Sequence, residues 1–147
     1  MEKMHASVIA IGKTAVLLRG PSGAGKSDLA LRLISAGAHL VSDDYVELQE
    51  LGGKIWAHAP QTIAGMIEVR GLGLINMPYI SGVRVGLACD LTPKDTIERL
   101  PDEQRWLKIG SCRVPLMPVD PETPSAPDRI TLALDQVRQI WPPVPVN

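Results

Sequence analysis

The sequence contains no phenylalanine, and its aromatic residues are three tryptophans and two tyrosines among 147 residues. Surfaces that stack the bases of single-stranded nucleic acids are built from aromatic side chains, so this composition disfavours such a partner. The charge points the same way, because 15 basic and 16 acidic side chains give a net charge of −1. Nucleic-acid binding typically needs a basic excess. We therefore expect no nucleic-acid partner and a core of Leu, Ile, Val, Ala and Met.

Cysteine and long hydrophobic runs are also scarce. Cys89 and Cys112 do not form a CxxC pair, and no His/Cys cluster surrounds them, which disfavours a zinc site. No apolar run reaches the roughly 18 residues that a membrane-spanning helix needs. The N-terminus lacks the cleavage pattern of a signal peptide. These absences predict a cytoplasmic protein with no membrane partner.

Turn signals and hydrophobic periodicity predict many strands and only two helices. The length suggests one domain, residues 1–140, followed by a proline-rich C-terminal tail, residues 141–147. The expected helices are residues 27–36 and 128–140, and a surface loop or short helix is expected at 92–104. The expected strands are residues 4–11, 14–18, 39–41, 45–51, 54–59, 67–70, 82–89 and 113–119. A doubly wound domain would have about four or five helical crossovers, so the pattern favours an α/β fold with a mixed, partly antiparallel sheet.

The most informative segment, residues 20–27, reads GPSGAGKS and matches the phosphate-binding pattern GxxxxGK[ST]. An expected strand precedes it and an expected helix follows it, which is the context that such a loop requires. Its glycines allow backbone N–H groups to surround phosphate oxygens, and the helix N-terminus adds its positive dipole end. Lys26 is expected to reach the β- and γ-phosphates, and the Ser27 hydroxyl to bind Mg²⁺. The predicted ATP-binding residues are Gly20, Pro21, Ser22, Gly23, Ala24, Gly25, Lys26 and Ser27.

Asp43 and Asp44 follow the expected strand after this helix. A carboxylate at a strand end beside a phosphate loop can hold Mg²⁺ or take a proton from an attacking hydroxyl. The alternative is a solvated turn in which aspartate accepts local hydrogen bonds. The nearby phosphate loop favours the catalytic interpretation.

Glu68 and Arg70 are two residues apart, so a strand would point both side chains to one face. Together they would provide a metal ligand and an anion-binding group, although an exposed ion pair of little consequence has the same spacing. His5 is a lone histidine on a short strand, and such residues are more often structural than catalytic. The residues alone leave both questions open.

These motifs, in this order, resemble the catalytic domain of the HPr kinase/phosphorylase family, which shares its phosphate loop with the phosphoenolpyruvate carboxykinases. The shared features are a histidine before the loop, the loop itself, the LVSDD segment and the segment IEVRGLGLIN at 67–76, which resembles the family signature. The resemblance runs from about residue 5 to about residue 100. It implies an α/β fold of the P-loop NTPase type, similar to phosphoenolpyruvate carboxykinase, with a mixed sheet and few helices.

The resemblance also implies roles for single residues. Lys26 and the loop would hold the triphosphate, and Ser27 and Glu68 look like the Mg²⁺ ligands. Asp44 looks like the proton acceptor of the kinase reaction and the proton donor of its reverse, with Asp43 as its neighbour. The remaining matches are His5 and Arg99 as active-site residues and Arg70 as a phosphate contact.

The implied activity is transfer of phosphate from ATP, with Mg²⁺, to a serine of an HPr-like phosphocarrier protein. The implied reverse reaction uses inorganic phosphate to remove that phosphate and releases pyrophosphate. Family members assemble as hexamers, which implies a homo-oligomer, and this chain resembles a short form that consists of the catalytic domain alone. The family's later loop, typically PxRPGRN, is here PVDPETP at 118–124, where acidic residues replace basic ones. The kinase reaction is therefore better supported than the reverse reaction.

Two other classes of function fit the phosphate loop alone. A small-molecule kinase would carry an arginine-rich lid after the core, and this chain has only scattered arginines there. A non-catalytic ATP-sensing module would bind ATP but keep its function when Asp44 is lost.

Overall fold

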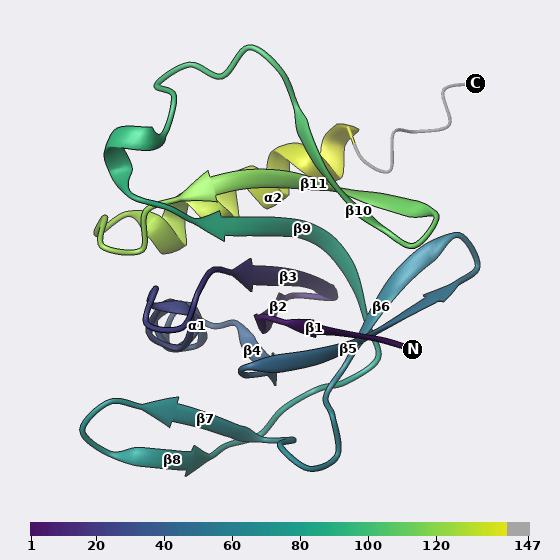
Figure 1. The fold of residues 1–147 in the computed structure, drawn as a ribbon, viewed down its shortest axis with the longest axis vertical. Coiled ribbons are helices and arrows are strands. Elements are labelled where there is room, and N and C mark those ends of the chain that lie inside the picture. The colour runs from purple at the N-terminus through teal and green to yellow at the C-terminus, as the bar shows by residue number, and fades with distance from the viewer. Residues whose placement is uncertain (141–147) are drawn as a thin grey trace.

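The computed structural model describes residues 1–140, which form a curled mixed sheet with two helices (Figure 1). The helices are α1 (Lys26–Ser35) and α2 (Ala126–Ile140), and a short 3-10 helix lies at Lys94–Thr96. The strands are β1 (Glu2–His5), β2 (Ser7–Ile11), β3 (Thr14–Arg19), β4 (His39–Ser42), β5 (Tyr45–Leu51), β6 (Lys54–His58), β7 (Met66–Val69), β8 (Gly73–Asn76), β9 (Val83–Leu91), β10 (Arg105–Ile109) and β11 (Cys112–Val119). The expected mixed α/β fold with few helices is confirmed. The expected tail at 141–147 lies outside the described residues.

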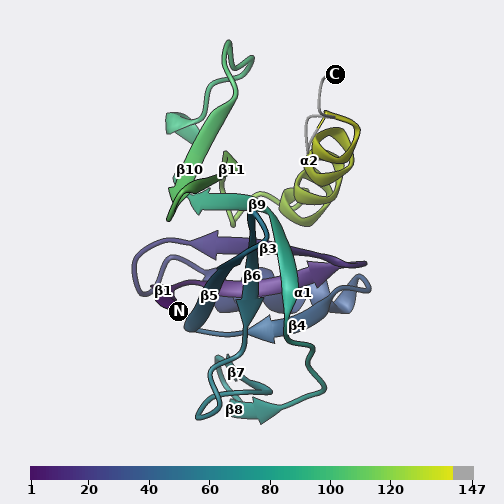
Figure 2. The same ribbon diagram turned by 90° about the vertical axis from the view of Figure 1, so that its right-hand side faces the viewer.

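β9 is the central strand of the sheet. On one edge it pairs in parallel with β3, which leads into the phosphate loop. On the other edge its first residues pair antiparallel with β6 and its last residues pair in parallel with β11. The main path runs β1-β5-β6-β9-β3-β2-β4, while β7 and β8 form a separate hairpin, seen at the bottom of Figures 1 and 2. Because β3 and β9 are parallel, their C-terminal ends lie side by side. The phosphate loop follows β3 and therefore lies at this end of the two strands.

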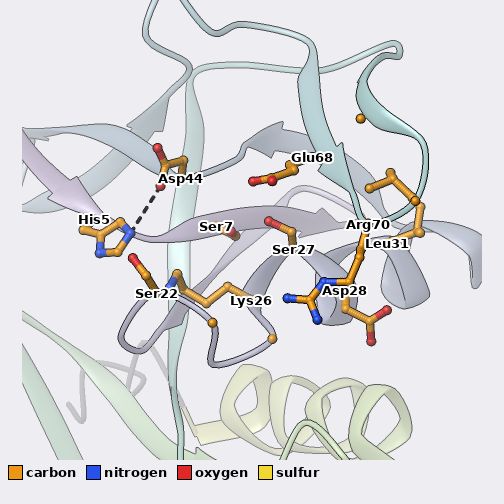
Figure 3. Close-up of a pocket in the computed structure, with 15 residues that line it drawn as sticks. His5, Ser7, Ser22, Lys26, Ser27, Asp28, Leu31, Asp44, Glu68 and Arg70 are labelled. Carbon is orange, nitrogen blue, oxygen red and sulfur yellow. Dashed lines mark ion pairs between the residues drawn. The ribbon is translucent and has the colours of Figure 1, made fainter.

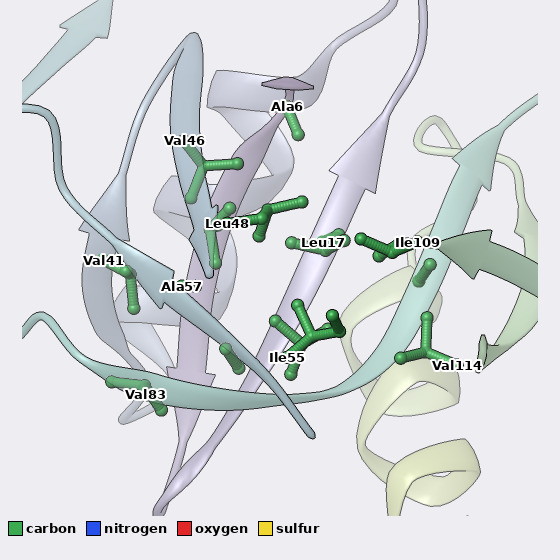
Figure 4. Packing of buried hydrophobic residues seen from close by; sticks show 14 of the residues in the cluster. Ala6, Leu17, Val41, Val46, Leu48, Ile55, Ala57, Val83, Ile109 and Val114 are labelled. Atoms are coloured by element: carbon green, nitrogen blue, oxygen red, sulfur yellow. The ribbon is translucent and has the colours of Figure 1, made fainter. Parts of the chain in front are cut away.

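Alternation along the strands builds one hydrophobic cluster on each face of the sheet. In β2, Val8 and Ala10 belong to one cluster and Ile9 to the other. The curled sheet itself encloses the first cluster (Figure 4). The second lies under the helices, where Leu29 and Leu33 of α1 are buried. This burial fixes α1, and with it the phosphate loop, to the sheet. No helix within residues 1–140 is both long and apolar enough to cross a membrane.

The pattern in β9 departs from simple alternation, which predicts Val85 and Leu87 on the same face. Instead, Leu87 belongs to the cluster under the helices, and Ala88 joins Val85. The register with β3 shifts here, and a β-bulge at Gly86 reverses the faces of the residues that follow. Glycine fits because a Cβ at position 86 would lie 2.4 Å from Cγ2 of Thr14.

The expected strand at 4–11 is two strands, which separate at Ala6. β1 pairs with β5, whereas β2 pairs with β3 and β4. The N–H of Ala6 donates to the carbonyl oxygen of Asp44 at 3.0 Å. No turn residue marks this change of partner, so the apolar pattern reads as one strand. The change matters because it places His5 beside the β4–β5 junction.

The structure contains two strands, β8 and β10, that the sequence pattern does not predict. The Gly71-Leu72-Gly73 segment reads as the end of a strand, but its first two residues lie in a turn and β8 begins at Gly73. β10 reads RWLKI, in which two apolar residues separate the exposed Arg105 and Lys108, so it lacks the alternation of a half-buried strand, and it pairs with β11. Short strands of this kind depend on their partner more than on their own sequence.

Candidate active site

A cavity of about 590 Å³ lies between the phosphate loop, the β7–β8 hairpin and the junctions β1–β2 and β4–β5 (Figure 3). Segments far apart in the sequence therefore form its walls. Among the predicted residues, those that line it together are His5, Ser22, Gly23, Gly25, Lys26, Ser27, Asp44, Glu68 and Arg70. Gly20, Pro21, Ala24 and Asp43 are not among its lining residues. Below, this cavity is called the phosphate-loop pocket.

The phosphate loop turns into α1 through two glycines with left-handed backbone conformations. Gly23 and Gly25 have φ angles of 83° and 100°, which a side chain would strain. The carbonyl oxygen of Gly25 accepts a hydrogen bond from the N–H of Leu29 at 3.0 Å, so the helix starts directly after the loop. Its first backbone N–H groups, which no helical carbonyl can satisfy, therefore lie at the pocket and favour an anion.

Lys26 is a buried cation in this wall, with a relative exposure of 7%. Its ammonium group donates to the carbonyl oxygens of Gly20 and Pro21 at 2.7 and 2.9 Å. Among the ion pairs of the described residues, none involves Lys26. A buried charge without a counter-ion is costly, and an anion that enters the pocket would relieve that cost.

Asp43 is a buried carboxylate, 6% exposed, that connects three segments. It accepts hydrogen bonds from the hydroxyl of Ser7 at 2.6 Å and from the hydroxyl of Ser27 at 2.8 and 3.0 Å. It also accepts one from the backbone N–H of Glu68 at 3.1 Å. Asp43 thus joins β2, the start of α1 and β7 at the base of the pocket.

Asp44 has the opposite character, because 65% of its side chain is exposed. It is the only non-glycine residue within 1–140 with a positive φ, 75°, and the N–H of Tyr45 donates to the carbonyl oxygen of Asp43 at 2.9 Å. This angle and this bond are those of a γ-turn, which is rare and strained. Strain of this kind costs on the order of 1–3 kcal/mol and is often found at functional sites. The turn separates Asp44 from the buried network of its neighbour.

His5 is the partner of Asp44. Its Nε2 atom lies 3.2 Å from Oδ1 of Asp44, and the dashed line in Figure 3 marks this pair. Its ring lies against the ring of Tyr45, with centroids 5.2 Å apart, and the pairing of β1 with β5 sets both residues opposite each other. The sheet therefore fixes the imidazole beside one oxygen of the Asp44 carboxylate.

Glu68 lies on β7 and Arg70 in the turn just after it, and both line the phosphate-loop pocket, as does Val69 between them. Figure 3 shows their side chains reaching into the cavity from the hairpin. The hairpin is tied to the sheet by the hydrogen bond from Glu68 to Asp43 and by Ile67, which is fully buried. Its inner end is therefore fixed, whereas Leu72 near its tip is exposed.

The pocket fits a nucleotide-bound Mg²⁺ better than a metal held by protein alone. Residues 1–140 contain no group of three or more His, Cys, Asp or Glu that could hold a metal ion. Mg²⁺ that is bound with a nucleotide needs only one or two protein oxygens, because phosphates and water supply the rest. The Ser27 hydroxyl donates its hydrogen bond to Asp43, so its lone pairs are available in the pocket, where the Glu68 carboxylate also lies.

Arg99 is the one predicted catalytic residue that the structure does not bring to this site. It lies on an exposed loop after the 3-10 helix and is not among the residues that line the phosphate-loop pocket. Its catalytic role remains a prediction from the resemblance.

The acidic segment at 120–123 lies beside the phosphate loop, although nothing in its composition suggests so. The carbonyl oxygen of Pro121 accepts a hydrogen bond from Arg32 of α1. A Cβ at Gly25 would lie 3.4 Å from the Pro121 ring. The negative charges of Asp120 and Glu122 therefore lie on either side of Pro121, the residue that packs against the loop.

Ser7 is a pocket residue that sequence reasoning does not identify. Its only signal is that it is polar within the otherwise apolar run at 6–11. Neither its burial nor its bond to Asp43 follows from local sequence, because both depend on how β2 lies beside the end of β4.

Comparisons with known proteins agree with these features. A sequence model of the HPr serine kinase C-terminal domain matches residues 1–124. A curated HPr kinase/phosphorylase from Clostridium tetani is 41% identical over 81 residues, which is 55% of this chain and 27% of that protein. The protein of the same name from Geobacillus thermodenitrificans is 36% identical over 127 residues, 79% of this chain and 41% of that protein. The chain thus spans well under half the length of these relatives.

A solved structure resembles the whole described fold. The structure of the Hpr(Ser) kinase/phosphatase from Coxiella burnetii superposes with a TM-score of 0.82 and 27% sequence identity. The match covers 95% of this chain and 92% of the other chain. The two-helix architecture with its curled sheet is therefore a known fold.

Proposed function

The chain belongs to the family of the HPr serine kinase C-terminal domain, and we propose that it transfers the γ-phosphoryl group of ATP to a serine of an HPr-like phosphocarrier protein. One observation carries the proposal: a buried cation without a counter-ion, Lys26, shares a pocket with an exposed carboxylate, Asp44. The cation suits the phosphates of ATP. The exposed carboxylate suits a hydroxyl that arrives on another protein. We place this reaction in the cytoplasm, where ATP is available.

The proposed chemistry needs a base, because a serine hydroxyl is a weak nucleophile. The serine oxygen forms a bond to the γ-phosphorus while the bond to the β,γ-bridging oxygen breaks and ADP leaves. The serine proton goes to the carboxylate of Asp44. His5 holds one carboxylate oxygen at 3.2 Å and leaves the other for the substrate. Lys26 and the loop N–H groups stabilise the negative charge that spreads over the phosphoryl oxygens.

Three further residues support the phosphates. Ser27 and Glu68 would hold Mg²⁺, which neutralises charge on the β- and γ-phosphate oxygens when it is bound. Arg70 lines the pocket from the hairpin and would add a bidentate contact to phosphate. Asp43 keeps Ser27 and Glu68 in place through the bonds described above.

The reverse reaction, in which inorganic phosphate attacks phosphoserine and pyrophosphate leaves, is the weaker half of this proposal. Against the pattern PxRPGRN of the resembling family, Asp120 and Thr123 stand in place of the two arginines and Glu122 in place of the glycine. Asp120 and Glu122 flank Pro121, which packs beside Gly25 of the phosphate loop. Negative charge there repels a second phosphate. We expect phosphorolysis to be slower than the kinase reaction. Assembly into a homo-oligomer, which the resemblance implies, belongs to the same proposal.

The test incubates the protein with γ-labelled ATP, Mg²⁺ and a phosphocarrier protein from the same organism. The proposal expects label on a serine of the phosphocarrier, and then labelled pyrophosphate after inorganic phosphate is added in excess. Light scattering of the same sample measures its assembly state. Nucleotide binding without label on the phosphocarrier would refute the proposed substrate and leave only an ATP-binding module.

A further inference from the structure

Ser7 has no part in the reaction proposed above, yet it lies at the phosphate-loop pocket. The residue is 1% exposed and lines the pocket together with Lys26. A buried hydroxyl needs a hydrogen-bond partner, and that of Ser7 donates to Oδ1 of Asp43 at 2.6 Å. This is the shortest of the bonds that Asp43 accepts.

Both oxygens of Asp43 are shared between two donors. Oδ1 accepts from Ser7 and Ser27, and Oδ2 accepts from Ser27 and from the backbone N–H of Glu68. Two of these three donors belong to the residues that would bind Mg²⁺. The orientation of the Asp43 carboxylate therefore decides where the Ser27 lone pairs point and where the Glu68 backbone lies.

Ser7 differs from the other donors because it comes from a strand that is paired on both sides within the main sheet. β2 pairs with β3 on one edge and with β4 on the other. Ser27 and Glu68, by contrast, come from a helix start and from a hairpin that has its own two-stranded sheet. Ser7 is thus the fixed point against which the carboxylate can be held.

We propose that Ser7 is a positioning residue for the metal site, which acts by holding Asp43 in the orientation that aligns Ser27 and Glu68. This inference rests on the proposed function only in requiring that a Mg²⁺-nucleotide binds here. Ser7 itself touches neither metal nor phosphate. Without its hydroxyl, Asp43 loses one of its donors and can rotate, and Mg²⁺ affinity falls. Binding of metal-free nucleotide depends on Lys26 and the loop and stays unchanged.

The experiment measures ADP binding by calorimetry, first in EDTA and then at rising Mg²⁺ concentrations. The informative pair is Ser7→Thr and Ser7→Val, because the two side chains have the same shape and only threonine keeps the hydroxyl. Partners that orient metal ligands typically change metal affinity by about 10- to 100-fold. We expect the Mg²⁺ concentration for half-maximal enhancement to rise at least tenfold in Ser7→Val and Ser7→Ala. In Ser7→Thr, which keeps the hydroxyl, this Mg²⁺ concentration should equal that of the wild type.

Val8→Ala is the control, since Val8 is a fully buried residue of the same strand, β2, and directly follows Ser7. Its side chain packs in the cluster that the curled sheet encloses and does not line the phosphate-loop pocket, so its truncation lowers stability and leaves the Mg²⁺ dependence alone. Equal Mg²⁺ dependence in Ser7→Thr and Ser7→Val overturns the inference. A wild-type protein whose ADP binding ignores Mg²⁺ overturns both the inference and the proposed metal site. A shifted Mg²⁺ dependence without any transfer to a phosphocarrier supports the inference and removes only the proposed substrate.

Discussion

Asp43 and Asp44 are neighbours in the chain, but the first residue is 6% exposed while the second has a side chain that is 65% exposed. Asp43 accepts hydrogen bonds from three groups on three segments. Asp44 has one side-chain partner, His5. The γ-turn at Asp44 causes the difference, because its positive φ turns this side chain away from the network that holds its neighbour. A carboxylate with every oxygen occupied can hold other groups, whereas one with a free oxygen can take a proton.

The largest effect is expected from Asp44→Asn, which removes the proposed base. Positioned acid–base groups contribute about 10²- to 10⁴-fold, so transfer to the phosphocarrier should fall by about 10³-fold. Asparagine tolerates a positive φ as well as aspartate does, so the free energy of unfolding should change by less than about 0.5 kcal/mol. Single-turnover transfer and urea unfolding measure both quantities. A variant that transfers at the wild-type rate would remove Asp44 from the reaction.

Asp43→Asn should show the reverse pattern. The amide cannot accept all the hydrogen bonds of the carboxylate, and an unsatisfied buried partner costs about 1–3 kcal/mol. The free energy of unfolding should therefore fall by about 2 kcal/mol. The rate of transfer at low Mg²⁺ should fall about 10- to 100-fold, because Ser27 and Glu68 lose their alignment. Urea unfolding and Mg²⁺ titration of activity test this. Unchanged stability would show that the network of Asp43 is not formed in solution.

His5→Gln is expected to have an intermediate effect confined to Asp44. Loss of the 3.2 Å contact that orients the Asp44 carboxylate should lower kcat about tenfold, which corresponds to about 1.4 kcal/mol, with little change in KM for ATP. Tyr45→Phe is the control, because the contacts of Tyr45 with His5 and Lys3 use only its ring. A rise in KM for ATP without a fall in kcat would place His5 in nucleotide binding instead.

The smallest effect is expected at Glu50, a carboxylate near the end of β5. The turn from β5 to β6 and helix α1 lie on opposite sides of the view in Figure 1. Hydrogen bonds from the Ser111 hydroxyl, and then from its backbone N–H, lower the pKa of Glu50 below its ordinary value of 4.5. A pKa that is lower in the folded state gives stability that is present above 4.5 and is lost as the pH falls through the folded-state value. Glu50→Gln should therefore lower Tm slightly at pH 7, and the gap to the wild type should close in acid.

Transfer by Glu50→Gln should equal that of the wild type at every pH where both are folded. A slower rate would show that Glu50 influences the reaction at the phosphate-loop pocket although it does not line that pocket. A Tm gap that widens as the pH falls would contradict the direction assigned to the pKa of Glu50.

The sequence predicts most of the pocket because the motif residues are local. The loop at 20–27, the helix after it and the pair Asp43-Asp44 need only strand–loop–helix order and short-range periodicity. The different roles of the two aspartates do not follow from sequence, because the γ-turn and the buried network arise from contacts with β1, β2 and β7. Ser7 is missed for the same reason, since its role depends on the pairing of β2 with β4.

The central claim is that Asp43 holds the site while Asp44 takes the proton. Single-turnover transfer from ATP to the phosphocarrier, measured at rising Mg²⁺ for Asp43→Asn and Asp44→Asn side by side, tests it most directly. We predict that saturating Mg²⁺ returns Asp43→Asn to within about tenfold of the wild-type rate, whereas Asp44→Asn remains about 10³-fold slow at every Mg²⁺ concentration. Rescue of Asp44→Asn by Mg²⁺, or a loss in Asp43→Asn that Mg²⁺ does not relieve, would contradict this division of roles.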